Sequence, residues 1–212
     1  MINDKCKICR RAGEKLFLKG ERCFSAKCAM IVKPYAPGIH GRGGKVGGRG
    51  GRRPSEFGLQ LREKQKLRNM YELREKQFRS YVEKAIDSKT QSGKKLLELL
   101  EGRVDNAVFR LGFAVSRSVA RQMVSHGHIW VNGRRSTASS RLLKKGDVVK
   151  VRPESLTKGM FVNLETLLKK HDAPAWLELD KDKKEGKVVS IPIVDESTTG
   201  INIGSIIEFY SR

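Results

Sequence analysis

The sequence predicts an α+β fold with three parts: a cysteine-bearing N-terminal arm, a helical domain, and a small α/β domain with a twisted mixed sheet. Three observations predict it. All four cysteines lie within residues 5–28. Residues 56–101 are rich in Glu, Lys, Leu, Arg and Gln, and their apolar residues recur at three- and four-residue spacing. Residues 103–152 mix helical and strand periodicity around one turn signal, Asn132-Gly133.

The charge of the chain indicates a polyanionic partner. The 212 residues include 44 Lys and Arg against 23 Asp and Glu, a formal net charge of +21. Residues 1–94 hold most of this excess, with 24 basic against 9 acidic side chains. Such an excess repels itself unless a polyanion neutralises it, and nucleic acid is the usual one.

An anionic membrane is the rival partner for a basic chain. It would need an apolar span or an amphipathic helix with a Trp, Phe and Leu face, and the sequence has neither. The N-terminus also lacks the pattern of a signal peptide. We therefore expect a soluble, intracellular chain with no membrane partner.

The cysteines have the spacing of metal ligands. A C-x2-C pair and a C-x4-C pair, separated by thirteen residues, fit a tetrahedral zinc ion bound by four thiolates. Disulfides are disfavoured in an intracellular chain, whereas an iron–sulfur cluster or free thiols remain as alternatives. We predict one structural Zn²⁺, and no catalytic metal because four protein ligands leave no open position. The expected ligands are Cys6, Cys9, Cys23 and Cys28.

Residues 37–54, PGIHGRGGKVGGRGGRRP, form a glycine- and arginine-rich tract. It has eight glycines, five basic residues and no acid, so it cannot build a core. A flexible linker is the simplest alternative. We favour a segment that orders against phosphates, because glycine lets the backbone approach them closely. Its basic residues are Arg42, Lys45, Arg49, Arg52 and Arg53.

A helical pattern begins at Ser55 or Glu56. The charges around it form weak individual pairs, so only their sum argues for RNA, with Lys64 and Arg68 as the expected contacts. The apolar stripe consists of Leu67, Met70, Tyr71, Phe78, Tyr81, Val82, Ala85 and Ile86.

Residues 103–152 predict two short helices beside a small sheet. In RVDNAVFRL, four apolar residues share one face, and Arg103 and Arg110 lie on an adjoining face. Ser116 is a natural N-cap and Gly127 a natural C-terminal stop for the second helix. Its arginines, at positions 117 and 121, share one exposed side, and HIWVNGRR predicts a strand and a hairpin. Basic side chains on such a platform suit phosphates; an ordinary α/β domain with a charged exterior is the alternative.

These residues carry a family resemblance. RVDNAVFRLGFAVSRSVARQMVSHGHIWVNGRR strongly resembles the RNA-binding domain of the small ribosomal subunit protein four family. The resemblance covers nearly the whole chain: CKICRRAGEKLFLKGERC looks like the zinc-bearing arm, REKQKLRNMYELREKQFRSYV like the helical domain, and IIEFYSR like the C-terminus. The central module alone is shared with RNA-modifying enzymes and some synthetases, whereas the full succession is far more specific.

We accordingly divide the chain into a zinc-binding arm with the start of the Gly/Arg tract (1–45), a helical domain (46–95) joined by the C-terminal tail (196–212), and an RNA-binding module with its extension (96–195). The resemblance implies a structural constituent of the small ribosomal subunit. Such a protein binds small-subunit ribosomal RNA as a primary binder, nucleates assembly and contributes to translational accuracy. Neighbouring ribosomal proteins, and messenger RNA where it enters the ribosome, are the other implied partners.

The resemblance also selects individual RNA contacts in the module. The residues carried over by motif, with the following arginine added, are Arg103, Arg110, Ser116, Arg117, Arg121, Gln122, His126, Arg134 and Arg135. We expect no enzyme, since no catalytic constellation accompanies the four histidines. The alternatives are an RNA-modifying or other RNA-binding protein that uses the same module, and a zinc-dependent DNA-binding regulator. The expected location is the cytoplasmic ribosome, with an organellar stroma or matrix also open.

Overall fold

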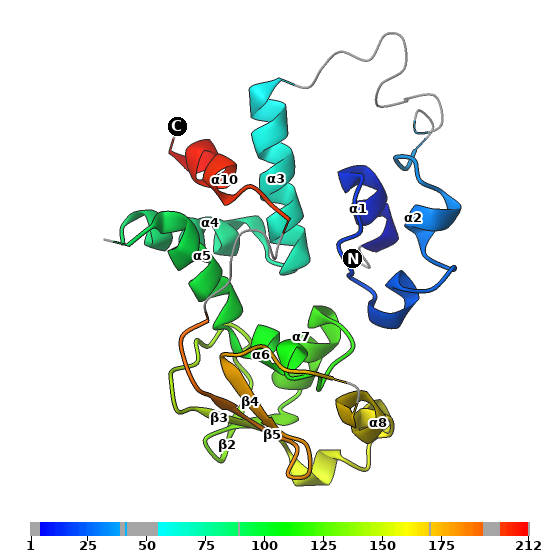
Figure 1. The fold of residues 1–212 in the computed structure, drawn as a ribbon, viewed down its shortest axis with the longest axis vertical. Coiled ribbons are helices and arrows are strands. Elements are labelled where there is room, and N and C mark those ends of the chain that lie inside the picture. The colour runs from blue at the N-terminus through cyan, green and yellow to red at the C-terminus, as the bar shows by residue number, and fades with distance from the viewer. Residues whose placement is uncertain are drawn as a thin grey trace. The chain divides into compact units, whose positions relative to one another are not determined.

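A computed structural model describes residues 5–38, 41, 55–88, 90–169, 171–192 and 200–211. The chain divides into two compact units. The first unit comprises Met1–Ile86 and Glu196–Arg212, so it includes the tail that we expected beside the helical domain. The second unit is Asp87–Asp195. Helices and a sheet are both present, and the α+β class is confirmed (Figure 1).

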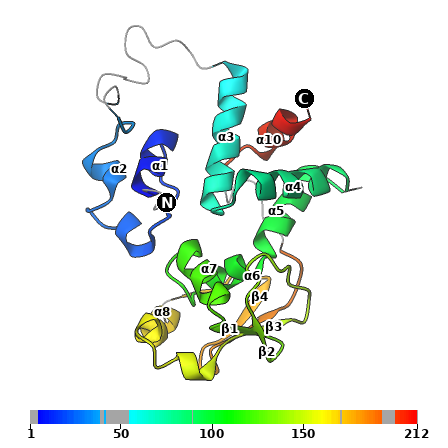
Figure 2. The same ribbon diagram turned by 180° about the vertical axis from the view of Figure 1, so that it is seen from behind.

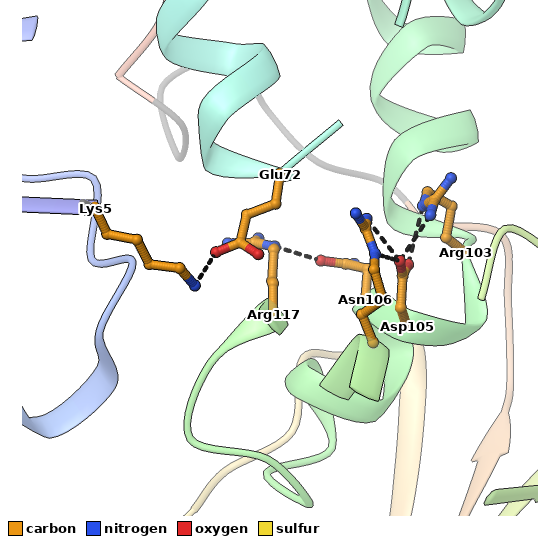
Figure 3. A network of polar contacts seen from close by, with 7 residues as sticks. Lys5, Glu72, Arg103, Asp105, Asn106 and Arg117 are labelled. Atoms are coloured by element: carbon orange, nitrogen blue, oxygen red, sulfur yellow. Dashed lines mark hydrogen bonds and ion pairs between the residues drawn. The ribbon is translucent and has the colours of Figure 1, made fainter. Parts of the chain in front are cut away.

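The first unit begins with an arm of short helices. These are α1 (Lys5–Ala12), the 3₁₀ helix η1 (Gly20–Cys23) and α2 (Ala29–Val32). A small apolar cluster of Cys9, Leu16 and Leu18 holds the arm together and packs against Met70. The Lys5 ammonium also pairs with the Glu72 carboxylate, as Figure 3 shows, so the arm is tied to the end of the next helix by charge as well.

The helical part of the first unit consists of α3 (Glu56–Met70), α4 (Glu75–Ile86) and α10 (Ile203–Tyr210). The Ser55 hydroxyl caps α3 by accepting from the Gly58 N–H at 3.2 Å, at the start that the sequence predicted. Helix α10 lies beside α3 in both views (Figures 1 and 2), with Ile203 and Ile206 fully buried. The predicted stripe is buried except for two residues: Met70 is half-buried and Ile86 is exposed.

The second unit contains one five-stranded sheet. The strands are β1 (Ile129–Val131), β2 (Arg134–Ser136), β3 (Val148–Val151), β4 (Leu177–Asp180) and β5 (Glu185–Val188). Their order is β2-β1-β3-β5-β4, and every neighbouring pair is antiparallel. The predicted mixed sheet is therefore wrong. Two neighbouring pairs are joined by tight turns, which only an antiparallel pair allows, whereas a parallel pair needs a long crossover.

Helices α5 (Ser92–Glu101), α6 (Val104–Arg110), α7 (Arg117–Ser125) and α8 (Leu164–Lys169) complete the second unit, with η3 (Pro153–Ser155) and η4 (Gly159–Phe161) between β3 and α8. One core joins α6 and α7 to the alternating inward residues of β1 and β3. The local signals act as predicted: the Ser116 hydroxyl accepts from the Val119 N–H, Gly127 adopts a φ of +75°, and Asn132-Gly133 forms the hairpin turn.

None of the helices formed by the described residues is both long enough and apolar enough to cross a membrane.

Candidate nucleic-acid interface

Asp105 is a buried carboxylate that holds two of the candidate arginines in the second unit. Its side chain is 3% exposed. Arg103 donates to it from Nε at 2.9 Å and from Nη2 at 2.6 Å, in the two-pronged geometry that fits a carboxylate (Figure 3). Arg121, one helix away, donates to the same carboxylate at 2.9 and 3.1 Å. Asp105 thereby links the start of α6 to the middle of α7.

Glu101 plays the same part for the other two arginines. Its side chain is fully buried, and Arg110 binds it through two hydrogen bonds of 2.8 and 2.9 Å. Asn106 donates to Glu101 at 2.7 Å and accepts from the Arg117 Nε at 2.8 Å. Arg117 also lies over the Phe109 ring, 4.7 Å from its centre. The guanidinium groups are therefore held in fixed orientations.

We call these four side chains the α6–α7 arginine cluster: Arg103, Arg110, Arg117 and Arg121. The two carboxylates, Glu101 and Asp105, neutralise only part of the charge of the four guanidinium groups, so the cluster keeps a net positive charge. Its members differ in access to a ligand, because Arg110 and Arg121 are about 30% exposed, Arg117 is 14% exposed and Arg103 only 1%. The sequence placed Arg117 and Arg121 on one exposed side, whereas the structure turns both toward buried acids.

The remaining motif residues of the second unit lie at the two ends of α7 and on β2. Ser116 is buried and serves as the N-cap, while Gln122 and His126 are exposed near the helix end. Arg134 and Arg135 are exposed on β2, at the edge of the sheet.

A second group of cations surrounds His128. The Arg135 guanidinium lies directly over Gly127, since its Nε is 2.1 Å from where a Cβ would stand. Arg152 donates its backbone N–H to the His128 carbonyl at 2.8 Å, and the His128 ring bonds to Ser155 at 2.9 Å.

Burial and neighbouring positive charges both act on the titration of His128. Burial lowers the pKa of His128 below its ordinary value, and the charges of Lys158, His126, Arg152 and Arg135 lower it further. We call His126, Arg135, Arg152 and Lys158 the His128 cluster. Arg152 and Lys158 were not among the sequence candidates. Their only signal was their basic character, because the 3₁₀ turn that brings them to His128 is not visible in the sequence.

Lys64 is buried in the first unit, and Arg68 is partly exposed there. The Lys64 ammonium, whose side chain is 8% exposed, pairs with Glu75 at 2.7 Å and lies over the Phe209 ring. Arg68 pairs with the same carboxylate at 3.0 Å. Burial tends to raise the pKa of Glu75, but these cations and the Tyr210 hydroxyl outweigh it and lower the pKa. Both bases thus help to hold α10 in place.

The four cysteines line one small pocket of about 20 Å³ in the arm. Three of them are buried, Cys6 is half-buried, and the Lys19 N–H donates to the Cys23 sulfur at 3.3 Å. Burial raises the pKa of Cys9, and the other cysteines add to this rise. Among the residues that the structure describes, no group of three or more His, Cys, Asp or Glu is arranged to hold a metal ion.

The Gly/Arg tract supplies five further RNA contacts that the sequence predicts. These residues lie outside the described part of the chain: Arg42, Lys45, Arg49, Arg52 and Arg53.

Comparisons with known proteins cover the whole chain. A family model described as Ribosomal protein S4/S9 N-terminal domain matches residues 1–101, and the S4 domain matches residues 102–149. The small ribosomal subunit protein uS4 of Syntrophomonas wolfei is 45% identical over 98% of this chain and 96% of its own length. The proteins of the same name from Solidesulfovibrio magneticus and Caldicellulosiruptor bescii are 45% and 46% identical, over 98% and 100% of this chain and 97% and 98% of theirs. The chain belongs to the uS4 family.

Membership of the uS4 family agrees with the resemblance that the sequence motifs indicated. The relatives carry the names of ribosomal proteins, in agreement with the expectation from the sequence that the chain is not an enzyme. The boundary between the two family models, at residues 101 and 102, falls where α5 ends and beside the buried Glu101. In this uS4 chain the first residues of the S4 domain therefore depend on a carboxylate from the preceding segment.

Proposed function

We propose that the chain is a structural constituent of the small ribosomal subunit in the cytoplasm and a primary binder of small-subunit ribosomal RNA. It would nucleate assembly and contribute to translational accuracy, with neighbouring ribosomal proteins and messenger RNA as further partners. The observation that carries the proposal is the full-length match to proteins named small ribosomal subunit protein uS4. The net charge of +21 and the two basic clusters support it, since phosphate contacts supply most of RNA affinity.

The buried acids support binding by preorganisation. An arginine already held by a carboxylate loses little side-chain freedom when a phosphate reaches its open edge. The partly exposed guanidinium groups of Arg110 and Arg121 suit this role, and Arg134 and Arg135 add exposed charge on β2 of the same unit. Arg103 and Lys64 would act differently, by shaping the fold that presents the other cations.

The test measures affinity of the full chain for small-subunit ribosomal RNA. Arg134→Ala with Arg135→Ala should weaken binding and lower the slope of log affinity against log salt by about 2, because two phosphate contacts are lost. The matched control is Lys181→Ala with Lys183→Ala, which removes the same charge from the exposed turn between β4 and β5. Equal losses in the two pairs would show only a general charge effect. A protein that never sediments with small subunits would contradict the function.

An RNA-modifying enzyme built on the same module is a weaker alternative. The uS4 relatives match along 96–98% of their own length, so the similarity does not stop at the shared module. Purified chain that changes a base in RNA would revive this alternative.

We also propose that the arm holds one structural Zn²⁺ through Cys6, Cys9, Cys23 and Cys28. The spacing of the cysteines, their shared pocket and the N–H donated to the Cys23 sulfur support it. Binding would take place with loss of the thiol protons, because the metal ligands are thiolates. A bound ion would link the segment of Cys6 and Cys9 to the segment of Cys23 and Cys28, and would thereby stabilise the arm.

Metal analysis of reduced, chelator-free protein tests this proposal. We expect about one zinc per chain, and faster hydrogen exchange in α1 of Cys9→Ser, with little change in β1 and β3 of the second unit. Iron in place of zinc, or no metal at all, would refute it.

A further inference from the structure

Two phenylalanines of the arm form an exposed stacked pair. The rings of Phe17 and Phe24 lie 5.1 Å apart with an angle of 28° between their planes. Phe24 is 76% exposed and Phe17 is 47% exposed. Burying an aromatic ring contributes a large favourable free energy to folding. Two exposed rings that stack on each other are therefore a candidate surface for binding a ligand.

The arm holds these rings outward through their sequence neighbours. Leu16 and Leu18 on either side of Phe17 are 3% and 5% exposed, and Cys23 before Phe24 is buried. Phe17 has a φ of +51°, in the left-handed region, which is sterically unfavourable for a bulky residue. This unfavourable conformation at Phe17 accompanies the burial of both neighbouring leucines and the exposure of the Phe17 ring.

The segment that carries the pair, residues 14–28, is basic. The exposed cations of this segment are Lys15, Lys19, Arg22 and Lys27. The segment has two acids, and one of them, Glu14, is already paired with Lys66 at 2.7 Å. A flat aromatic surface among cations is the combination that binds unpaired bases, because the ring stacks on the base while the cations contact the flanking phosphates. A protein partner would gain from the basic residues only if it carried acidic side chains at matching positions, whereas RNA has a phosphate on each side of every base.

We propose that Phe17 and Phe24 form a stacking platform for an unpaired base of the ribosomal RNA. Phe24, the more exposed ring, carries the stacking face, and Phe17 supports it from behind. The basic residues around the pair hold the backbone on either side of that base. This proposal rests on the proposed function, and it adds base contact by the arm to phosphate contact by the arginines.

The affinity of full-length Phe24→Ala for small-subunit ribosomal RNA tests the proposal. Loss of one stacked base should weaken binding about tenfold. The salt slope should stay that of the wild type, because no charge is removed. Phe24→Tyr should bind as the wild type does, since it keeps the ring. Val32→Ala is the matched control, because Val32 is also apolar and 62% exposed in the arm but carries no ring that could stack on a base.

The base itself can be located by ultraviolet crosslinking and chemical probing. We expect a crosslink between one base and the peptide that contains Phe24. In Phe24→Ala that base should regain reactivity toward base-specific reagents, while backbone protection elsewhere persists. Unchanged melting of Phe24→Ala would show that the arm stays folded, and recovery in Phe24→Tyr separates stacking from a folding defect.

The outcomes also separate this proposal from the proposed function. Wild-type chain without affinity for ribosomal RNA would overturn the function itself. Wild-type binding that Phe24→Ala fully retains would overturn the stacking platform alone. The platform would likewise be wrong if Phe24→Ala kept its RNA affinity and lost only the attachment of a neighbouring ribosomal protein.

Discussion

At the scale of single residues, buried carboxylates decide how the arginines of the second unit are presented. Glu101 and Asp105 have almost no exposed side-chain surface, and each binds at least two cationic groups. Removing a carboxylate from water has a large desolvation penalty, so a buried carboxylate is tolerated only with close cationic partners. Loss of an acid therefore affects stability first and RNA binding second.

Glu101→Ala should destabilise the second unit by about 3 kcal/mol, near the lower end for a broken buried pair. Arg110 retains some access to water, which limits the loss, whereas Asn106 loses a buried acceptor. Urea unfolding measures the change. Glu83→Ala is the control: its pair with Arg79 is exposed on both sides, so the loss there should stay below about 1 kcal/mol. Equal losses in the two variants would contradict the buried pairing.

His128 makes stability depend on pH. Burial, with the positive charges around it, lowers its pKa below 6.5 in the folded state. As pH falls below about 6.5, the unfolded chain takes up a proton that the folded chain refuses, so stability decreases until the folded pKa is reached. Urea unfolding at pH 7.5 and 5.5 should show this loss in the wild type. His128→Gln should lose less between the two pH values, and an unchanged loss would count against the assignment.

At the scale of elements, the stop after α7 also positions a cation. Gly127 and Gly133 have nearly the same φ, +75° and +73°, but only Gly127 lies under a side chain, that of Arg135. Both Gly→Ala changes should cost about 1 kcal/mol or more in strain. Gly127→Ala should cost further stability and also weaken RNA binding, because it displaces the guanidinium. Equal effects on RNA affinity would mean that the position of Arg135 is unimportant.

The C-terminal helix completes the first unit. Ile206 of α10 is fully buried, while its neighbour Ile207 is partly exposed. Ile206→Ala should destabilise the unit by about 2–5 kcal/mol, and Ile207→Ala should cost clearly less. Hydrogen exchange in α3 should rise with the first change, since α10 packs on that helix. Exchange that rises equally in β1 and β3 would show that the two units are not independent.

These elements show what sequence patterns can reach. Ser55 and Ser116 begin helices where predicted, and Asn132-Gly133 forms the turn, because each signal acts over a few residues. The direction of the strands was missed. β3 and β5 are neighbours although α8 and β4 separate them in the chain, and periodicity within a strand carries no information on its partner.

At the scale of the whole molecule, charge controls RNA affinity. If about eight phosphates are neutralised, affinity should fall by about 10⁴ between 50 and 200 mM salt. Filter binding of the full chain across this range measures the slope. A nearly flat response would contradict phosphate binding by the excess of 44 basic over 23 acidic residues.

The sequence by itself determined the α+β class, the family and the basic character of this chain, because composition and local motifs suffice for each. It also determined where α3 and α7 begin, where α7 ends and where the hairpin turns. Only the tertiary structure decided which cations are exposed and which are buried. Arg103 and Lys64 are as basic as Arg134 in the sequence, yet Arg103 is buried against Asp105, two residues along the chain, and Lys64 is buried against Glu75 of the next helix. The exposed Phe17 and Phe24 were likewise indistinguishable from core residues, because exposure depends on what the rest of the chain covers.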